Sequence, residues 1–482
     1  MYYEKFMSRM ITSSGWSTDE EFSTSQGCLN GGWDAHPAQG GVILYNHDRK
    51  LVVDGGDECR HVLIIGATGT GKSRLIIMPS LIYSLRAIEK RSMVIFDVKG
   101  ELRQATLYTA QENGYQIVNV DFRQPSQGDA WNPFARANRL FQTGRKQNKE
   151  KAWKLVEDII ASVFNDGACT KSDPFWRNSS SDLFRGICTV LWESGKEVTL
   201  QSVLKLSDSI PGDKDDDGQC ELFRLAARLP ASSAANRRLA GFQRGSDTTR
   251  GNVLASFRGY LSPLTARSDV LDMVSGKNSI DLQQVGTSPT VLYISLPDDT
   301  TALGALQGIL LQQLMQELNE CAIVHSGRLP VRTEIYLDEL CNIKPAIPSL
   351  ETALTIARSR GIRYVLAVQS YAQLTQTYGA AAETISANTS TWIALNIAKD
   401  ETFRSKLSQL CGYNPLGDPL ITPSQLALLG YEEAIVIRER CAPYFTLLDD
   451  VVDGLTKERG GDKPITRRNS TRRTTGRRSC QA

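Results

Sequence analysis

The amino-acid sequence predicts an α/β fold in which a mainly parallel sheet is interrupted by an all-helical domain. Short aliphatic runs alternate with helical stretches from about residue 41 to 134, a pattern typical of parallel strands joined by helices. Between about residues 135 and 281 the runs give way to charged, Ala- and Leu-bearing segments with helical spacing. Strand-like runs then return as TVLYISLP, TEIYLDEL, YVLAVQS and STWIALNI. A helical domain inserted into one sheet explains this order.

The chain of 482 residues is long enough for two or three domains. We expect GGVILY (40–45) to be the first strand of the parallel sheet, and GYEEAIVIRER and APYFTLL to form a terminal pair of strands. The expected division is an N-terminal extension (1–40), the first part of the sheet domain (41–135), the inserted helical domain (136–284), the second part of the sheet domain (285–455) and a basic disordered tail (456–482).

Composition excludes several classes of protein. With 41% hydrophobic and 22% charged residues, the chain is neither disordered nor collagen-like. No stretch approaches the roughly 18 uncharged apolar residues that cross a bilayer, and the polar N-terminus is neither a signal peptide nor an anchor. Ten cysteines without a C-x-x-C pair and four isolated histidines argue against a zinc site or a disulfide framework and for reduced, cytoplasmic thiols.

The C-terminal tail concentrates positive charge. Residues 460–482 hold seven basic side chains and one acid, Asp462, in a segment without apolar periodicity. Such an arm can contact nucleic acid or an anionic membrane surface. A tail that only increases solubility is the alternative.

A phosphate-binding motif follows the aliphatic run HVLII. It comprises Gly66, Ala67, Thr68, Gly69, Thr70, Gly71, Lys72 and Ser73 and matches G-x-x-x-x-G-K-[ST] between a strand and a helix, which is the context the motif requires. Glycines let the backbone N–H groups converge on an anion at a helix N-terminus. We expect Lys72 to reach the β- and γ-phosphates of a nucleotide and Ser73 to ligate Mg²⁺.

Two acids stand at the end of a later strand. Such pairs are common on protein surfaces, but together with a P-loop they favour a hydrolytic site. In TEIYLDEL, Asp338 is placed to hold Mg²⁺ and Glu339 to polarise the attacking water, the two functions that a P-loop lacks. The next strand ends at Gln369, which the βαβ spacing places beside Asp338 at the ligand-binding edge of the sheet. Gln369 could sense the γ-phosphate or cap a neighbouring backbone group. Arg358, on the intervening helix, could project toward a neighbouring subunit or be a solvated helix end.

One further motif is weaker. Residues 213–218, DKDDDG, copy the first half of a calcium-binding loop, but position 12 is Arg224 where a Glu is expected. We therefore interpret this segment as an acidic solvated loop.

These motifs, in this order, resemble the coupling proteins of type IV secretion systems over roughly residues 41–450. The resemblance includes HVLIIGATGTGKS, the family's D-P-K-G-E element as DVKGE (97–101), WNP ahead of the helical insertion, LDELCNIKPAIPSLETALTIARSRGI, and VLAVQSYAQLTQTYG. It implies a RecA-like P-loop NTPase domain with an inserted all-α domain, an ATPase of the DNA-translocating type that uses ATP and Mg²⁺, and six subunits around a channel. It also implies that Arg358 acts on the adjacent subunit's γ-phosphate.

The chain departs from the family pattern at two places. Val98 replaces the proline of D-P-K-G-E, which changes a local backbone restriction only. The N-terminal transmembrane pair of most members is missing, so we expect a shorter soluble member. We expect it to be cytoplasmic or peripheral at the inner face of the bacterial cell membrane. A separate membrane-anchoring partner is one way in which the protein could be recruited to the membrane.

The resemblance implies a coupling protein that links a relaxase and its single-stranded DNA to the channel components. A substrate-receptor adaptor for protein cargo, with the nucleotide site as an assembly switch, is the alternative. A double-stranded DNA pump is disfavoured because residues 451–482 are too short and polar for a winged-helix reader. An NAD enzyme is disfavoured because no G-x-G-x-x-G follows the first strand.

Overall fold

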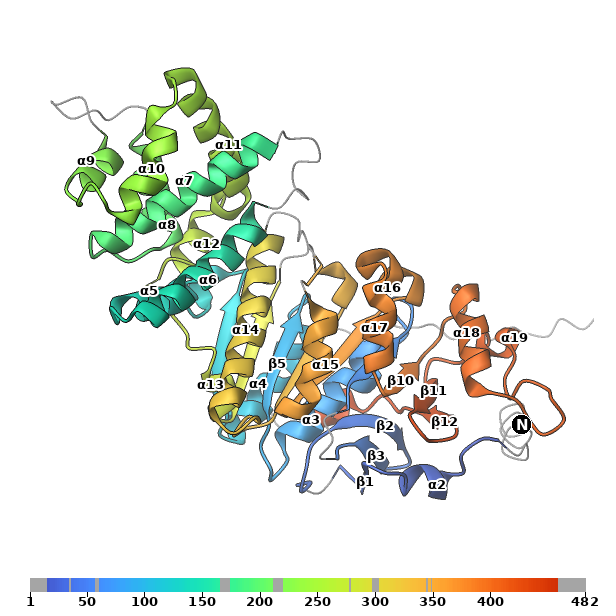
Figure 1. The fold of residues 1–482 in the computed structure, drawn as a ribbon. Coiled ribbons are helices and arrows are strands. Elements are labelled where there is room, and N and C mark those ends of the chain that lie inside the picture. The colour runs from blue at the N-terminus through green and yellow to red at the C-terminus, as the bar shows by residue number, and fades with distance from the viewer. Residues whose placement is uncertain are drawn as a thin grey trace, which may run out of the picture.

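The computed structural model describes residues 15–33, 36–56, 60–164, 174–210, 220–276, 279–296, 303–343, 346–347 and 349–457. A central sheet lies in the middle of the molecule, with a bundle of helices at one end and a small N-terminal sheet near the other (Figure 1). The α/β class predicted from the sequence is confirmed.

The central sheet has nine strands in the order β12-β11-β10-β4-β9-β8-β5-β7-β6. Seven of them, from β10 to β6, are parallel, and the expected terminal pair, β11 and β12, adds two antiparallel strands at one edge. The strands are β4 (Val62–Ile65), β5 (Ser92–Asp97), β6 (Gln116–Asp121), β7 (Thr290–Ser295), β8 (Thr333–Leu337), β9 (Ile362–Val368), β10 (Thr391–Ala394), β11 (Glu433–Arg438) and β12 (Tyr444–Leu447). Parallel strands place all their carboxyl ends at one edge, where ligands bind in such sheets.

Alternate side chains of each strand contribute to two separate cores. Leu63 and Ile65 of β4 belong to one hydrophobic cluster, and Val62 and Ile64 to the other, as expected for strands buried on both faces. The first face is covered by α14 (Gly304–Val324), α15 (Leu350–Arg360), α16 (Tyr371–Tyr378), α17 (Ala381–Asn388) and α18 (Glu401–Cys411). The second is covered by η1 (Lys72–Ile77), α3 (Met78–Leu85) and α4 (Glu101–Glu112). Short elements at connections and at the chain end are η2 (Pro125–Gln127), α13 (Gln284–Thr287), η4 (Leu340–Asn342), α19 (Pro423–Leu426) and α20 (Val452–Lys457).

Between β6 and β7 the described elements are all helical, and α5 to α12 form the bundle in Figure 1. They are α5 (Ala135–Gln142), α6 (Lys146–Val163), α7 (Pro174–Glu193), α8 (Leu200–Asp208), α9 (Glu221–Ala227), α10 (Ala234–Arg244), α11 (Asp247–Thr265) and α12 (Ser268–Met273). Their buried residues belong to the same hydrophobic cluster as the first face of the sheet. Polar contacts reinforce this junction: Arg136 forms an ion pair with Glu317 of α14 at 2.7 Å, and Gln316 donates to Asp158 at 2.8 Å.

The prediction that GGVILY begins the parallel sheet is wrong. Residues Val42–His47 form β2 of a separate antiparallel sheet with β1 (Cys28–Gly31) and β3 (Lys50–Asp54). Only Asp48 and Arg49 separate β2 from β3, and both have positive φ, 50° and 64°. A two-residue connection of this kind makes a hairpin, whereas parallel strands need a crossover of about a dozen residues.

A buried charge network joins the small sheet to the central sheet beneath the amino ends of the parallel strands. Arg91 binds Glu334 at 2.9 Å and donates to the Gly55 carbonyl at 2.7 Å. Arg363 donates to the carbonyl of Asp54 at 2.6 Å, and its guanidinium lies 3.6 Å from Glu334. Each charged side chain is 1–2% exposed, so each charge has an opposite charge as its partner inside the protein.

His61, just before β4, is buried and neutral. The Tyr364 N–H donates to its Nδ1 at 3.0 Å, so Nε2 carries the proton and donates to the Leu354 carbonyl at 2.9 Å. Burial lowers the pKa of His61 to about 4, and Arg363 and Arg358 act in the same direction.

We expect this histidine to make the protein sensitive to acid. Its pKa is lower in the folded chain than in the unfolded one, so its contribution to stability is full above about pH 6.5 and decreases by about 3 kcal/mol as the pH falls to about 4. In His61→Gln, whose amide can still donate to Leu354, urea unfolding should vary less steeply with pH across this window. An equal slope in both proteins would contradict the assignment.

Candidate active site

The P-loop follows β4 at the carboxyl edge of the sheet. Two backbone hydrogen bonds fix its start, from the N–H of Gly66 to the Val368 carbonyl at 3.2 Å and from that of Ala67 to the Asn396 carbonyl at 3.3 Å. Gly69 and Gly71 have φ of 81° and 93°, a region that disfavours residues with a Cβ. The loop therefore adopts its turn because glycine stands at both positions.

Lys72 lies across this loop. Its side chain is buried, and its Nζ donates to the carbonyls of Gly66 at 2.6 Å and Ala67 at 3.1 Å. Burial lowers the pKa of the Lys72 ammonium, while the carboxylates of Asp338 and Glu339 oppose that shift. The predicted phosphate ligand and the predicted acids thus share one electrostatic environment.

Ser73 and Asp338 meet although 265 positions separate them. The Ser73 hydroxyl donates to Oδ2 of Asp338 at 2.7 Å. Oδ1 of Asp338 is buried and has no hydrogen-bond partner among the described residues, and burial raises the pKa of this carboxyl. A hydroxyl and a carboxylate with an unused buried oxygen fit a hard cation such as Mg²⁺.

Glu339 is held in an unusual backbone conformation. Its φ of 59° and ψ of 46° are left-handed, which is uncommon outside glycine and occurs at functional sites. Asn342 donates to one carboxylate oxygen at 2.6 Å, and Lys99 forms an ion pair with the other at 3.4 Å. Both oxygens of the predicted base are therefore engaged in this structure.

The segment 97–101 places Lys99 beside Glu339. Buried Asp97 ends β5 and accepts backbone N–H groups of Gly100 at 2.7 Å and Arg103 at 2.8 Å, which shapes the turn into α4. Because β5 is paired with β8, this turn lies beside the two acids. The segment matches a family element, but the sequence patterns predict no role for Lys99 or Asn342. The spacing in LDELCN, which puts Asn342 three residues after Glu339, is a signal that could have indicated Asn342.

Gln369 and Arg358 lie at opposite edges of the sheet. Gln369 follows β9, which lies between β4 and β8, so the side chain is near the start of the P-loop and is half-buried. Arg358 is exposed on the last turn of α15, which leads into the amino end of β9. The structure brings Gln369 to the site but leaves Arg358 away from the site of its own chain.

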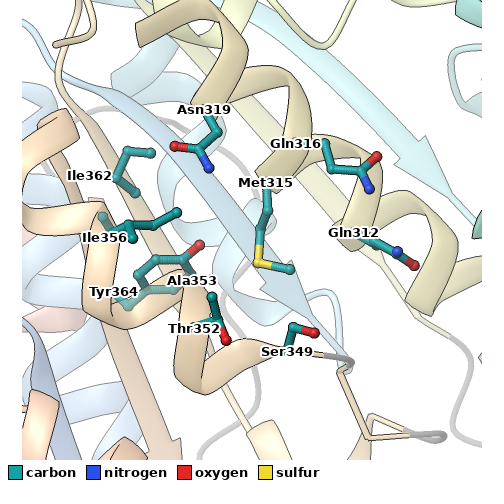
Figure 2. Close-up of a pocket in the computed structure, with 11 residues that line it drawn as sticks. Gln312, Met315, Gln316, Asn319, Ser349, Thr352, Ala353, Ile356, Ile362 and Tyr364 are labelled. Atoms are coloured by element: carbon teal, nitrogen blue, oxygen red, sulfur yellow. The ribbon is translucent and has the colours of Figure 1, made fainter. Parts of the chain in front are cut away.

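A separate pocket of about 230 Å³ lies between α14 and α15 (Figure 2). Met315 and Asn319 of α14 face Ile356 of α15 across it, with Tyr364 of β9 below. It contains no residue of the P-loop and neither acid, so it is distinct from the predicted nucleotide site.

Two predictions fall outside the described residues. The loop 213–218 and the basic segment 460–482 belong to this part of the chain. Within the described ranges, no helix combines the length and apolar character needed to span a bilayer.

The sheet order and the site define a RecA-like P-loop nucleoside triphosphatase fold with an inserted all-α domain. Residues 34–416 match the family described as "Type IV secretory system Conjugative DNA transfer", and the chain belongs to this family. The resemblance found in the motifs is thereby confirmed.

Curated relatives agree with this assignment. The chain is 25% identical over 358 residues to "Protein VirD4" of Rhizobium radiobacter, covering 71% of this chain and 46% of the relative. It is 24% identical over 412 residues to "Protein VirD4" of Rhizobium rhizogenes, covering 78% and 56%. The chain thus spans about half the length of the curated relatives it matches.

Solved structures share the fold. "Plasmid coupling protein TrwB in complex with ADP and Mg2+" is similar with a TM-score of 0.57 and 20% identity over 82% of this chain and 86% of that chain. VirB4 of Thermoanaerobacter pseudethanolicus is similar with a TM-score of 0.51 and 14% identity over 85% and 96%. Since both identities are low, these likenesses support the architecture.

We expect the ionised Asp338 carboxylate to lower the free energy of unfolding when no cation is bound to it. Its folded-state pKa is raised, so the carboxyl favours folding most at low pH, and that advantage is lost as the pH rises through the folded pKa. Asp338→Asn should therefore raise stability by about 1 kcal/mol at pH 7, measured by urea unfolding without metal or nucleotide. A less stable variant at pH 7 would contradict this reading.

Proposed function

We propose that the chain is an ATP-hydrolysing coupling protein that links a relaxase and its single-stranded DNA to a type IV secretion channel and helps drive transfer. The observation that supports it best is the contact between Ser73 of the P-loop and Asp338 of β8, with Glu339 next in sequence. Membership of the conjugative DNA transfer family supports the substrate class.

Each site residue has a role in this proposal. The P-loop amides and Lys72 bind the phosphates, and Gln369 senses the γ-phosphate. Ser73 and Asp338 would hold Mg²⁺, which neutralises charge on the phosphates when bound. TrwB structures named as complexes with ADP and Mg²⁺ and with an ATP analogue support the choice of ATP and Mg²⁺.

Glu339 orients and polarises the attacking water in this scheme. To do so, its carboxylate must exchange the contact with Lys99 or Asn342 for the water, since both oxygens are engaged. Gln373 of α16 lies 3.5 Å from Asn342, and α16 begins two residues after Gln369. A movement at the strand that senses phosphate can therefore reach the base through one hydrogen-bonded segment.

We also propose that six copies form the active assembly, on the cytoplasmic side of the membrane and with a membrane-anchoring partner. Arg358 acts on the γ-phosphate of the adjacent subunit. Its place supports an action between chains: it is exposed, and it lies at the opposite edge of the sheet from the P-loop of its own chain.

Glu339→Gln should bind ATP with near wild-type affinity but hydrolyse it at least about 100-fold more slowly, because the amide cannot accept a proton. Lys72→Ala should lose both binding and hydrolysis. Glu401→Gln, on the exposed surface of α18, serves as the matched control. Turnover of Glu339→Gln close to wild type would exclude Glu339 as the base.

Single-stranded DNA should stimulate ATP turnover, more strongly at low than at moderate salt, together with a shift to the mass of a hexamer. The measurement compares turnover with and without DNA, and Lys72→Ala is the blank. ATP binding without any effect of DNA would contradict the motor and favour the adaptor for protein cargo.

Arg358→Ala should be inactive alone, yet regain turnover when mixed with inactive Lys72→Ala. In the mixture some interfaces combine an intact P-loop from one chain with an intact Arg358 from the other. A mixture as inactive as its components, at concentrations where both form hexamers, would exclude action in trans.

A further inference from the structure

The order of the strands determines in which direction along the sheet a nucleotide bound at the P-loop would extend. In the proposed function the reacting phosphate faces Asp338 and Glu339, which follow β8. From the P-loop strand β4, β8 lies on one side beyond β9, and β10 and β11 lie on the other. A nucleotide whose phosphates occupy the P-loop and whose γ-phosphate points toward β8 therefore extends its nucleoside toward β10 and β11.

A loop before β11 lies where the nucleoside would be. Because β11 is antiparallel to β10, and Ala394 at the end of β10 pairs with Ile435 near the start of β11, the residues just before β11 are at the same edge as the P-loop. Asn396 links them directly: its carbonyl accepts the Ala67 N–H, and its side chain donates to the Leu429 carbonyl at 2.8 Å.

Tyr431 of this loop lies against the P-loop and is partly exposed. A Cβ built on Gly71 would lie 3.3 Å from Cε2 of Tyr431, and the tyrosine is 46% exposed. Partial burial and the charge of Asp450 raise the pKa of its hydroxyl, and the charge of Arg74 opposes this shift. The ring therefore lies beside the start of the phosphate-binding helix.

The hydroxyl end of the ring is near an ion cluster. Arg74 follows Ser73 in the P-loop helix and forms ion pairs with Asp450 and, at 2.8 Å, with Asp453. These acids come after β12 and fix the C-terminal segment against the P-loop helix. The charges of Asp450 and Arg74 in this cluster act on the Tyr431 hydroxyl in opposite directions.

We propose that Tyr431 is the stacking platform for the purine base of the bound nucleotide. This inference rests on the proposed function and assigns a subsite within it. A flat aromatic side chain with an exposed face stabilises a base by stacking, by an amount that depends little on the base's edge. Tyr431 binds the part of ATP that does not react, so it contributes affinity and not catalysis.

The test compares two ligands that share the phosphates but not the base. Tyr431→Ala should weaken binding of ATP and ADP by about tenfold or more, the usual size of a base–aromatic stack. Its binding of inorganic tripolyphosphate should equal that of the wild type. Tyr431→Phe should retain near wild-type affinity for all three. Tyr413→Ala, at a tyrosine that is 59% exposed on another loop, is the matched control.

Two results would overturn the inference. One is an equal loss of ATP and tripolyphosphate affinity in Tyr431→Ala, which would show that the ring only supports the P-loop. The other is unchanged ATP affinity in Tyr431→Ala while Lys72→Ala still abolishes it, which would leave the nucleotide function intact without this subsite. Failure of the wild type to bind ATP would instead refute the proposed function itself.

Discussion

The fold depends on five charged side chains that are buried together beneath the amino ends of the parallel strands. Arg91, Arg363 and Arg438 surround Asp54 and Glu334, and each belongs to a different strand or lies directly beside one. Removing one partner of such a network leaves an uncompensated charge, which typically costs about 3–5 kcal/mol. The network connects Asp54 of the small sheet to residues of the central sheet, so detaching the small sheet would leave buried charges without their partners.

The two edges of the sheet have opposite electrostatic character. At the amino edge three arginines surround two acids in a fully buried cluster, and Tyr336 adds a hydrogen bond to Glu334 at 2.8 Å. At the carboxyl edge Asp338 keeps an oxygen without a partner among the described residues, and Glu339 has a left-handed backbone. Both are unfavourable for folding and useful for binding a cation and water.

Much of this arrangement could be predicted from the sequence because local signals were strong. The P-loop requires glycines at defined positions, and an aliphatic run ending in Asp338 and Glu339 indicates a buried strand with acids at its end. The placement of Gln369 beside the Asp338 strand followed from βαβ spacing alone. These features depend on short segments whose patterns report their structure directly.

What could not be predicted depended on contacts between distant segments. The strand at residue 42 has the same aliphatic pattern as a parallel strand, and only its two-residue connection to β3 identifies a hairpin. The partners of Glu339 come from other segments, Lys99 from the turn after β5 and Asn342 from η4. No periodicity reports that Tyr431 lies against Gly71, because 360 positions separate them and only the antiparallel edge strand brings them together.

The inserted helical domain shares one continuous hydrophobic core with the first face of the sheet. α14 belongs to both parts, since it packs on the sheet and forms polar contacts with the insertion through Glu317 and Gln316. Bending at this junction would expose apolar surface and separate buried charges. The shared core therefore ties the insertion to the sheet, and if the sheet rotated as one body with it, the displacement would be larger at the far end of the bundle than at the junction.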